Sequence, residues 1–173
     1  MNIVWTHFPL HPETPEEGVT LEELFAGRNV DRQASQARMR GLMAQEGLPY
    51  GERTKTYNSR LAQELGKWAD TQPNGAGIHD ALFRAYFVDG QNIGNVDTLV
   101  AIAEGLGLSG AEARQVLAQR HFKDAVDADW QRSSTFGITG VPTFVANGRG
   151  VVGAQPYEVL ERLMEVAGVP PRR

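Results

Sequence analysis

The chain contains no cysteine among its 173 residues. A cysteine thiolate is the nucleophile of disulfide exchange and a ligand of iron–sulfur clusters and of cysteine-type zinc sites. These chemistries are therefore excluded for this chain. The absence is the sharpest limit that composition sets on function.

Basic clusters and long apolar runs are also scarce. The net charge is −4, and the densest basic groups, Arg53 with Lys55 and Arg172 with Arg173, are too short to follow a phosphate backbone. No apolar run approaches the roughly 20 residues of a membrane span. The residues after Met1 show neither the basic region nor the small-residue cleavage site of a signal peptide. We therefore expect a cytoplasmic protein that binds neither nucleic acid nor membranes.

The first thirty residues predict little regular structure. Residues 2–8 are rich in β-branched and aromatic types and stop at Pro9, which predicts a short strand. A polar stretch to about residue 30 follows, with a short helix expected at 21–25.

The apolar spacing from about residue 31 to 135 is helical. One face of the expected helix at 56–70 carries apolar side chains at steps of four, four and three: Tyr57, Leu61, Leu65 and Trp68. Ser109 and Glu112 have the spacing of a capping box, which predicts a helix start there, continuing to Trp130. We expect helices at 31–46, 56–70, 78–88, 96–105 and 110–130. The core is expected to include Trp68, Phe83, Phe87 and Trp130.

The last forty residues change character. Residues 143–153 read as strand, turn and strand, because Asn147-Gly148 suits the positive φ angles of a tight hairpin. Pro156 suits the first position of a helix, since it has no amide hydrogen to lose. Gly168 and the prolines after it predict where that helix ends.

The run from Thr139 to Phe144, Thr-Gly-Val-Pro-Thr-Phe, is the strongest candidate for a functional loop. A Val–Pro bond adopts the cis form at a cost of only about 0.5–1 kcal/mol. A cis bond here would turn the backbone N–H and C=O of Val141 outward, where they can pair with an extended peptide or a γ-glutamyl-type backbone. The alternative is that Pro142 simply starts the hairpin as a trans residue.

Five segments together resemble the cytoplasmic DsbA-like branch of the thioredoxin fold, which includes 2-hydroxychromene-2-carboxylate isomerase and kappa-class glutathione transferase relatives. They are residues 7–12 (HFPLHP), 57–61 (YNSRL), 81–87 (ALFRAYF), 137–144 (GITGVPTF) and 153–157 (GAQPY). The resemblance runs from about Trp5 to Val166. It implies an α/β fold in which residues 1–30 and 136–173 form a thioredoxin-like core and residues 31–135 an inserted helical domain. It also implies thiol–disulfide oxidoreduction as the activity of the lineage.

The chain departs from this pattern at its front. Family members begin with a strand, a Cys-x-x-Cys or serine-containing turn and a helix, and none of these precedes Trp5. No catalytic residue can therefore be assigned. The absent strand is normally central, so the sheet must close differently, recruit a strand from another chain, or leave backbone groups unpaired at about 1–3 kcal/mol each. We interpret the chain as a shortened form that lacks the redox chemistry.

The resemblance implies a binding site at Gly140, Val141 and Pro142, with Phe8 and Asn58 as neighbours. Asn58 could hydrogen-bond a ligand there or cap the helix that follows, and the sequence favours neither. Glutathione is the one small-molecule ligand that the resemblance suggests.

No metal site is predicted. His7 and His11 are four residues apart, but Pro9 and Pro12 exclude the helical geometry that would bring both to one ion.

Three functional classes remain open from the sequence. The first is a member of the oxidoreductase lineage that has no redox cysteines. The second is an isomerase or glutathione-binding relative. The third is a non-catalytic interaction module that binds an extended peptide or forms a strand-exchanged homodimer.

Overall fold

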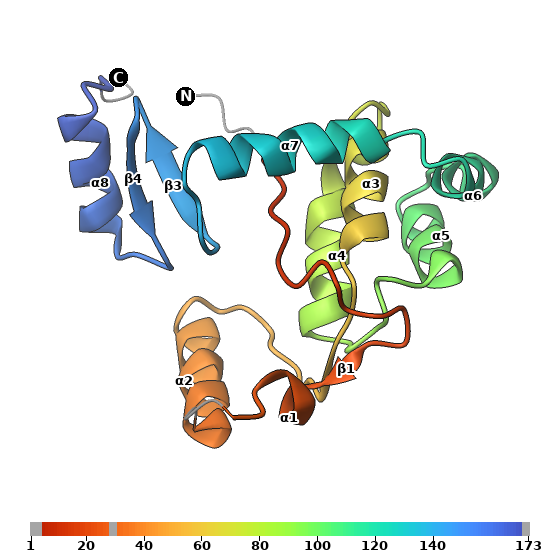
Figure 1. The fold of residues 1–173 in the computed structure, drawn as a ribbon, viewed down its shortest axis with the longest axis horizontal. Helices are drawn as coiled ribbons and strands as arrows, with labels where there is room; N and C mark the ends of the chain where they lie inside the picture. The colour runs from red at the N-terminus through yellow and green to blue at the C-terminus, as the bar shows by residue number, and fades with distance from the viewer. Residues whose placement is uncertain (1–4, 28–30, 171–173) are drawn as a thin grey trace. The chain divides into compact units, whose positions relative to one another are not determined.

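The computed structural model describes residues 5–27 and 31–170. Contacts group these residues into two units, one made of residues up to 10 and from 127 onward, the other of residues 11–126. The domain boundaries expected near residues 30 and 135 stay a prediction. Helices dominate both units (Figure 1), and the described strands form two antiparallel pairs.

The unit of residues 11–126 is a cluster of short helices. It contains α1 (Leu21–Leu24), α2 (Arg32–Gln45), α3 (Arg60–Ala69), α4 (Ile78–Phe87), α5 (Val96–Gly105), α6 (Gly110–Ala118) and a 3₁₀ turn at Gly75–Gly77. Strand β1 (Val19–Thr20) pairs antiparallel with β2 (Lys55–Thr56). The helices predicted from the apolar spacing are confirmed, although α3 begins at Arg60 rather than near residue 56.

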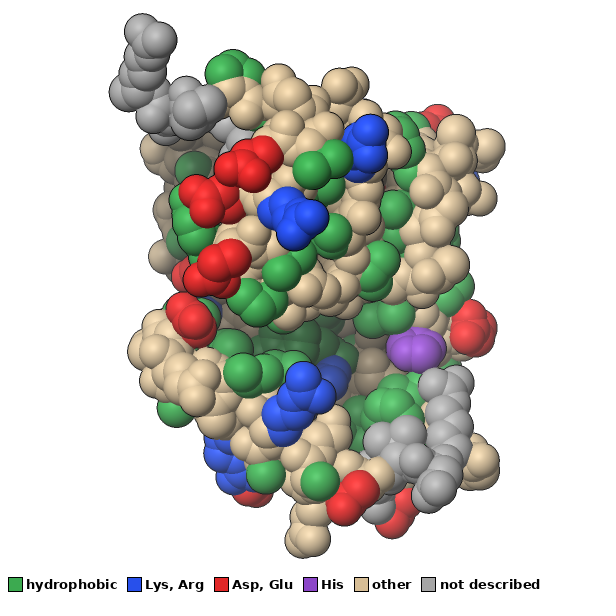
Figure 2. All heavy atoms as spheres, turned by 90° about the vertical axis from the view of Figure 1, so that its left-hand side faces the viewer, with side chains coloured by type: hydrophobic (Ala, Val, Ile, Leu, Met, Phe, Trp, Pro, Cys, Tyr) green, Lys and Arg blue, Asp and Glu red, His purple; other side chains and the backbone are tan. Residues whose placement is uncertain are grey.

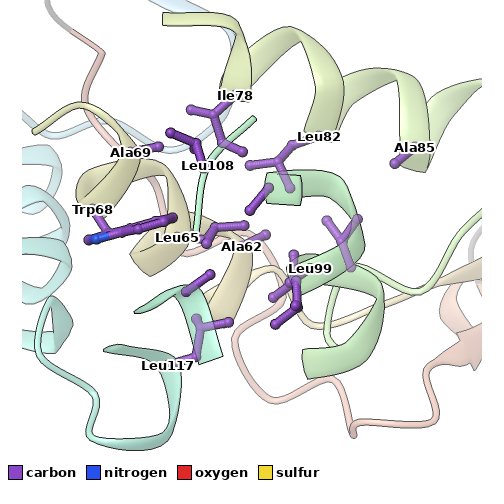
Figure 3. Close-up of a cluster of buried hydrophobic side chains, with 14 residues drawn as sticks. Ala62, Leu65, Trp68, Ala69, Ile78, Leu82, Ala85, Leu99, Leu108 and Leu117 are labelled. Atoms are coloured by element: carbon purple, nitrogen blue, oxygen red, sulfur yellow. The ribbon is translucent and has the colours of Figure 1, made fainter. Parts of the chain in front are cut away.

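One hydrophobic core holds α3 to α6 together. Leu65, Ile78 and Leu99 are fully buried, and Figure 3 shows their side chains converging with those of Leu82 and Leu117. Trp68 is buried as predicted.

The prediction for Phe83 is wrong, because its side chain is exposed. The buried face of α4 is formed by Ile78, Leu82 and Ala85, which recur at steps of four and three. Phe83 follows Leu82 directly and is therefore turned about 100° away from that face.

The expected helix at 110–130 is interrupted. The Ser109 hydroxyl accepts the Glu112 N–H at 3.3 Å, which confirms the predicted start of α6. The helix then ends at Ala118, and α7 (Lys123–Thr135) begins after four intervening residues. Arg120 lies between them with a φ of 54°, a left-handed conformation that no helix continues.

The other unit carries most of α7, a β-hairpin and a further helix. Strand β3 (Thr143–Ala146) pairs with β4 (Arg149–Val152), and Asn147 and Gly148 form the turn with φ of 47° and 75°. This confirms the predicted hairpin. Helix α8 (Tyr157–Val166) contacts both strands, with Pro156 just before its first residue rather than at it.

The predicted strand at 2–8 is not found where it can be checked. Residues 2–4 lie outside the described residues, and Trp5–Phe8 is not in a strand. The backbone of His7 is bound by side chains of α7 instead: its N–H donates to Asp129 Oδ2 at 2.9 Å, and its carbonyl accepts the Ser133 hydroxyl at 3.2 Å. Across the helices that the structure describes, none has the length and apolar character needed to cross a membrane.

Candidate ligand-binding loop

The loop before β3 contains the one cis peptide bond of the described residues, Val141–Pro142. This confirms the predicted cis proline. The Val141 side chain is 49% exposed and Pro142 is exposed as well, whereas Gly140 is half-buried. The Thr143 hydroxyl donates to the Gly140 carbonyl at 2.7 Å, which ties the loop to the first residue of the strand.

The hairpin register shows which backbone groups of β3 are used. The Gly153 N–H donates to the Pro142 carbonyl at 2.7 Å, so residue 142 faces β4. Hydrogen-bonded and non-hydrogen-bonded pairs alternate along an antiparallel ladder. The N–H and C=O of Thr143 and Val145 therefore point away from β4. In the described structure no hydrogen bond engages the N–H or C=O of Val141.

The loop lies in an uncharged stretch. From Thr139 to Asn147 there is no acidic or basic residue. Backbone amides and carbonyls, apolar side chains and uncharged polar side chains such as that of the exposed Thr139 are what this stretch offers a ligand. In the part of the chain that the structure describes, no three metal-ligating side chains gather at one place.

Two further residues were predicted to belong to the site. Phe8 is half-buried and belongs to the same unit as the loop. Asn58 belongs to the other unit, where its Nδ2 donates to the carbonyls of Pro12 at 3.0 Å and Thr14 at 2.8 Å, and its Oδ1 accepts the Arg60 N–H at 2.9 Å. These bonds hold the loop at 12–14 against the start of α3. A role for Phe8 or Asn58 in ligand binding stays a prediction.

Sequence reasoning missed a buried carboxylate, Glu64, in the helical unit. Its side chain is 2% exposed and accepts Arg60 Nε at 2.7 Å, Arg120 Nε at 2.7 Å and Arg120 Nη2 at 2.6 Å. Burial alone would raise the pKa of this carboxyl, but the hydrogen bonds from Arg120 and Arg60 outweigh it and lower the pKa below its usual value. The four-residue spacing of Arg60 and Glu64 was visible in the sequence, whereas Arg120 was not, since it is 56 residues away from Glu64.

A second cluster missed by the sequence surrounds Arg53. Its guanidinium lies 4.4 Å from the centre of the Tyr86 ring and 5.3 Å from that of Phe87. The Tyr86 hydroxyl hydrogen-bonds Arg53 Nη1 and also Thr56 Oγ1, the latter at 2.9 Å. The cation–π contacts attach the segment before α3 to α4.

Comparison with known proteins places these features in a family. A family model described as a DSBA-like thioredoxin domain matches residues 1–165. A solved structure of a probable DsbA oxidoreductase from Streptomyces coelicolor is 30% identical, with a TM-score of 0.79 over 94% of this chain and 74% of that one.

More distant structures share the fold. A 2-hydroxychromene-2-carboxylate isomerase is 18% identical with a TM-score of 0.65 over 79% of this chain and 65% of that one. The cytosolic disulfide reductase DsbM from Pseudomonas aeruginosa, solved with GSH, is 21% identical with a TM-score of 0.54 over 79% of this chain and 70% of that one.

A curated protein of Bacillus subtilis, YwbO, is 32% identical over 103 residues, which are 59% of this chain and 52% of that protein. The chain thus spans about half the length of this curated relative.

Proposed function

The chain belongs to the family of DSBA-like thioredoxin domains, and we propose that it is a non-redox member whose Gly140–Pro142 loop binds the backbone of an extended peptide or of a small thiol such as glutathione. Its relatives include oxidoreductases and an isomerase, but the chain itself has no cysteine. Without a thiolate it has no nucleophile for disulfide exchange. We further propose a cytoplasmic location, supported by the cytosolic disulfide reductase among its structural neighbours.

The observation that carries this proposal is the exposure and the hydrogen bonding of Val141. Its side chain is half exposed and its backbone N–H and C=O take part in no hydrogen bond of the described structure. Unpaired N–H and C=O groups beside a strand can accept an extended ligand as an added strand. The uncharged stretch from Thr139 to Asn147 suits a ligand that is recognised through its backbone groups.

Glutathione is the first small ligand to test. It has its own peptide groups, and the structural neighbour DsbM was solved with it. That neighbour is 21% identical, so it supports the fold, and the ligand is a proposal for this chain.

Calorimetric titration with glutathione, and separately with a short uncharged β-forming peptide, tests the proposal. Saturable binding of at least one of them is expected. Val141→Arg should weaken that binding at least about tenfold, which is about 1.4 kcal/mol, because the long side chain obstructs the approach to the exposed backbone groups. Val166→Arg is the matched control, since Val166 is similarly exposed but lies on α8, and it should bind as the wild type does.

Two results would contradict the proposal. One is the absence of binding for both ligands, or equal affinities for the two arginine variants. The other is catalytic reduction of insulin disulfides by the purified chain, which would show redox chemistry without a cysteine.

A further inference from the structure

A small hollow lies in the helical unit, between the neighbouring helices α4 and α5 (Figure 1). Its volume is about 260 Å³, and all of its lining residues fall between residues 81 and 106. They belong to the unit of residues 11–126, so this unit alone determines the shape of the hollow. Pockets for drug-sized ligands measure roughly 300–1,000 Å³, and a ligand that fits here is therefore small.

Small side chains keep this space open. Ala81 and Ala85 lie one turn apart on α4, so their methyl groups share one face of the helix. On α5, a Cβ at Gly105 would meet no atom within 4 Å. Ile102 and Leu106 line the hollow as well. The wall that a ligand would meet is therefore apolar.

Three exposed polar side chains also line the hollow: those of Arg84, Asp89 and Gln91. Within the part of the chain that the structure describes, no hydrogen bond or ion pair engages any of these three side chains. A positive and a negative charge thus lie at one small site without forming an ion pair. Asp89 follows the C-terminal end of α4, where the helix dipole adds to the attraction for a cation.

We propose that this hollow binds a small zwitterion with an apolar body, which is the chemical class of the apolar amino acids and short apolar peptides. The Arg84 guanidinium binds the carboxylate of the ligand, since its paired N–H groups match the two carboxylate oxygens. The Asp89 carboxylate accepts hydrogen bonds from the ammonium group of the ligand. The apolar body lies against the wall of the hollow, where it is removed from water.

The charge pattern favours a zwitterion over a ligand with a single charge. An apolar acid would bring a second negative charge to Asp89, and an apolar amine would bring a second positive charge to Arg84. A zwitterion can meet an opposite charge at each of the two residues. The proposed site at Val141 is different, because the stretch from Thr139 to Asn147 carries no charge. The two sites therefore select their ligands by different chemistry.

Titration of the full chain with leucine, and separately with the dipeptide alanyl-leucine, tests the proposal and distinguishes the two sources of such a ligand. Backbone amide signals in proton–nitrogen NMR spectra report binding residue by residue. At least one of the two probes should shift the amide signals of residues 81–106 saturably in the millimolar range. The absence of saturable shifts there would overturn the proposal, even if the probes bind near Val141, because the spectra separate the two sites.

Two arginine variants test the role of Arg84. Arg84→Gln should weaken binding of the probe at least about fivefold, because one charge-assisted contact with the carboxylate is lost. Arg38→Gln is the matched control, since Arg38 is also exposed but lies on α2. Figure 2 views the side on which α2 lies and shows Lys and Arg side chains spread over the surface there. Circular dichroism checks that both variants keep their helices, and equal affinities of the two variants would contradict the proposal.

Probes without the ammonium group test the role of Asp89. Isocaproate is leucine without its amino group, and N-acetylation removes the charge from alanyl-leucine. Each should bind at least about fivefold more weakly than its parent probe, and Asp89→Asn should abolish this difference. A neutral-ended probe that binds wild type as tightly as its parent would overturn the assignment of a zwitterion.

Discussion

Removing the charge of Glu64 is the most informative perturbation of the helical unit. The carboxylate accepts three charge-assisted hydrogen bonds of 2.6 to 2.7 Å: two from Arg120 join α3 to the segment between α6 and α7, and one from Arg60 lies within α3. Arg60 also reaches onward, since its Nη2 donates to the Lys123 carbonyl at 2.8 Å. Glu64→Gln keeps the shape of the side chain but removes the counter-charge of both arginines.

The expected loss of unfolding free energy follows from the burial of Glu64, Arg60 and Arg120. Removing one member of a buried ion pair costs about 3–5 kcal/mol, because the remaining charge is left without compensation. Glu64 and Arg60 are largely buried, but Arg120 is 42% exposed and can turn its guanidinium toward water. We therefore expect a loss of about 2–3 kcal/mol for Glu64→Gln, below the fully buried range.

Chemical denaturation, monitored by the circular dichroism signal of the helices, measures this loss of unfolding free energy. At roughly 2–4 °C per kcal/mol for a chain of this size, the midpoint of thermal unfolding should fall by about 5–10 °C. Glu52→Gln is the matched control, because Glu52 pairs with Arg40 at 3.3 Å on the surface. Such exposed pairs contribute roughly 0–1 kcal/mol, so the control should change little.

The lowered pKa of Glu64 adds a pH test. A carboxyl whose folded pKa lies below its unfolded value stabilises the fold above that unfolded value, about 4.5, and this stabilisation is lost as pH falls through the folded pKa. The stability gap between wild type and Glu64→Gln should therefore be constant near neutral pH and shrink below about pH 4.5. A variant as stable as the wild type, or a gap that does not change in acid, would refute the reasoning.

Two further predictions concern packing in the same unit, and thermal unfolding measures both. Gly75→Ala should lower the free energy of unfolding by at least about 2 kcal/mol, because a Cβ there would lie 1.7 Å from the Ala69 carbonyl oxygen. Gly41→Ala on α2 is its control: a Cβ there meets nothing within 4 Å, and the change should stabilise the helix by about 0.5–1 kcal/mol. Leu99→Ala should cost about 2–5 kcal/mol because Leu99 is fully buried, whereas Leu42→Ala on the exposed side of α2 should stay within about 0.5 kcal/mol of wild type. A cost of Gly75→Ala below that of Gly41→Ala, or equal costs of the two leucine variants, would contradict the packing described for this unit.

Local signals were sufficient for most elements of the fold. The hairpin followed from Asn147-Gly148, because few residue pairs accept two positive φ angles in succession. The helices followed from apolar spacing, which records the one face that each must bury. The cis bond of Pro142 followed from the motif in which the proline occurs.

Elements that depend on distant partners could not be predicted in this way. A strand at Trp5–Phe8 needs a neighbouring strand to pair with its backbone, and among the described residues side chains of α7 bind that backbone at His7 instead. The break between α6 and α7 lies at Arg120, whose guanidinium binds a carboxylate on α3. Neither effect is visible within a window of sequence. The exposure of Phe83 shows the same limit, since an apolar residue next to the buried face of a helix can be either buried or exposed.

The candidate site would hold a ligand through the backbone groups of one residue, and this limits its affinity. The groups that would hold a ligand are backbone atoms of Val141, which need no cysteine. A net gain of about 0.5–1.5 kcal/mol per hydrogen bond gives at most about 3 kcal/mol for the two bonds of one residue. A dissociation constant of 1 mM already requires about 4 kcal/mol. Contacts with apolar neighbours must therefore supply the remainder, and a titration of glutathione should extend into the millimolar range before absence of binding is concluded.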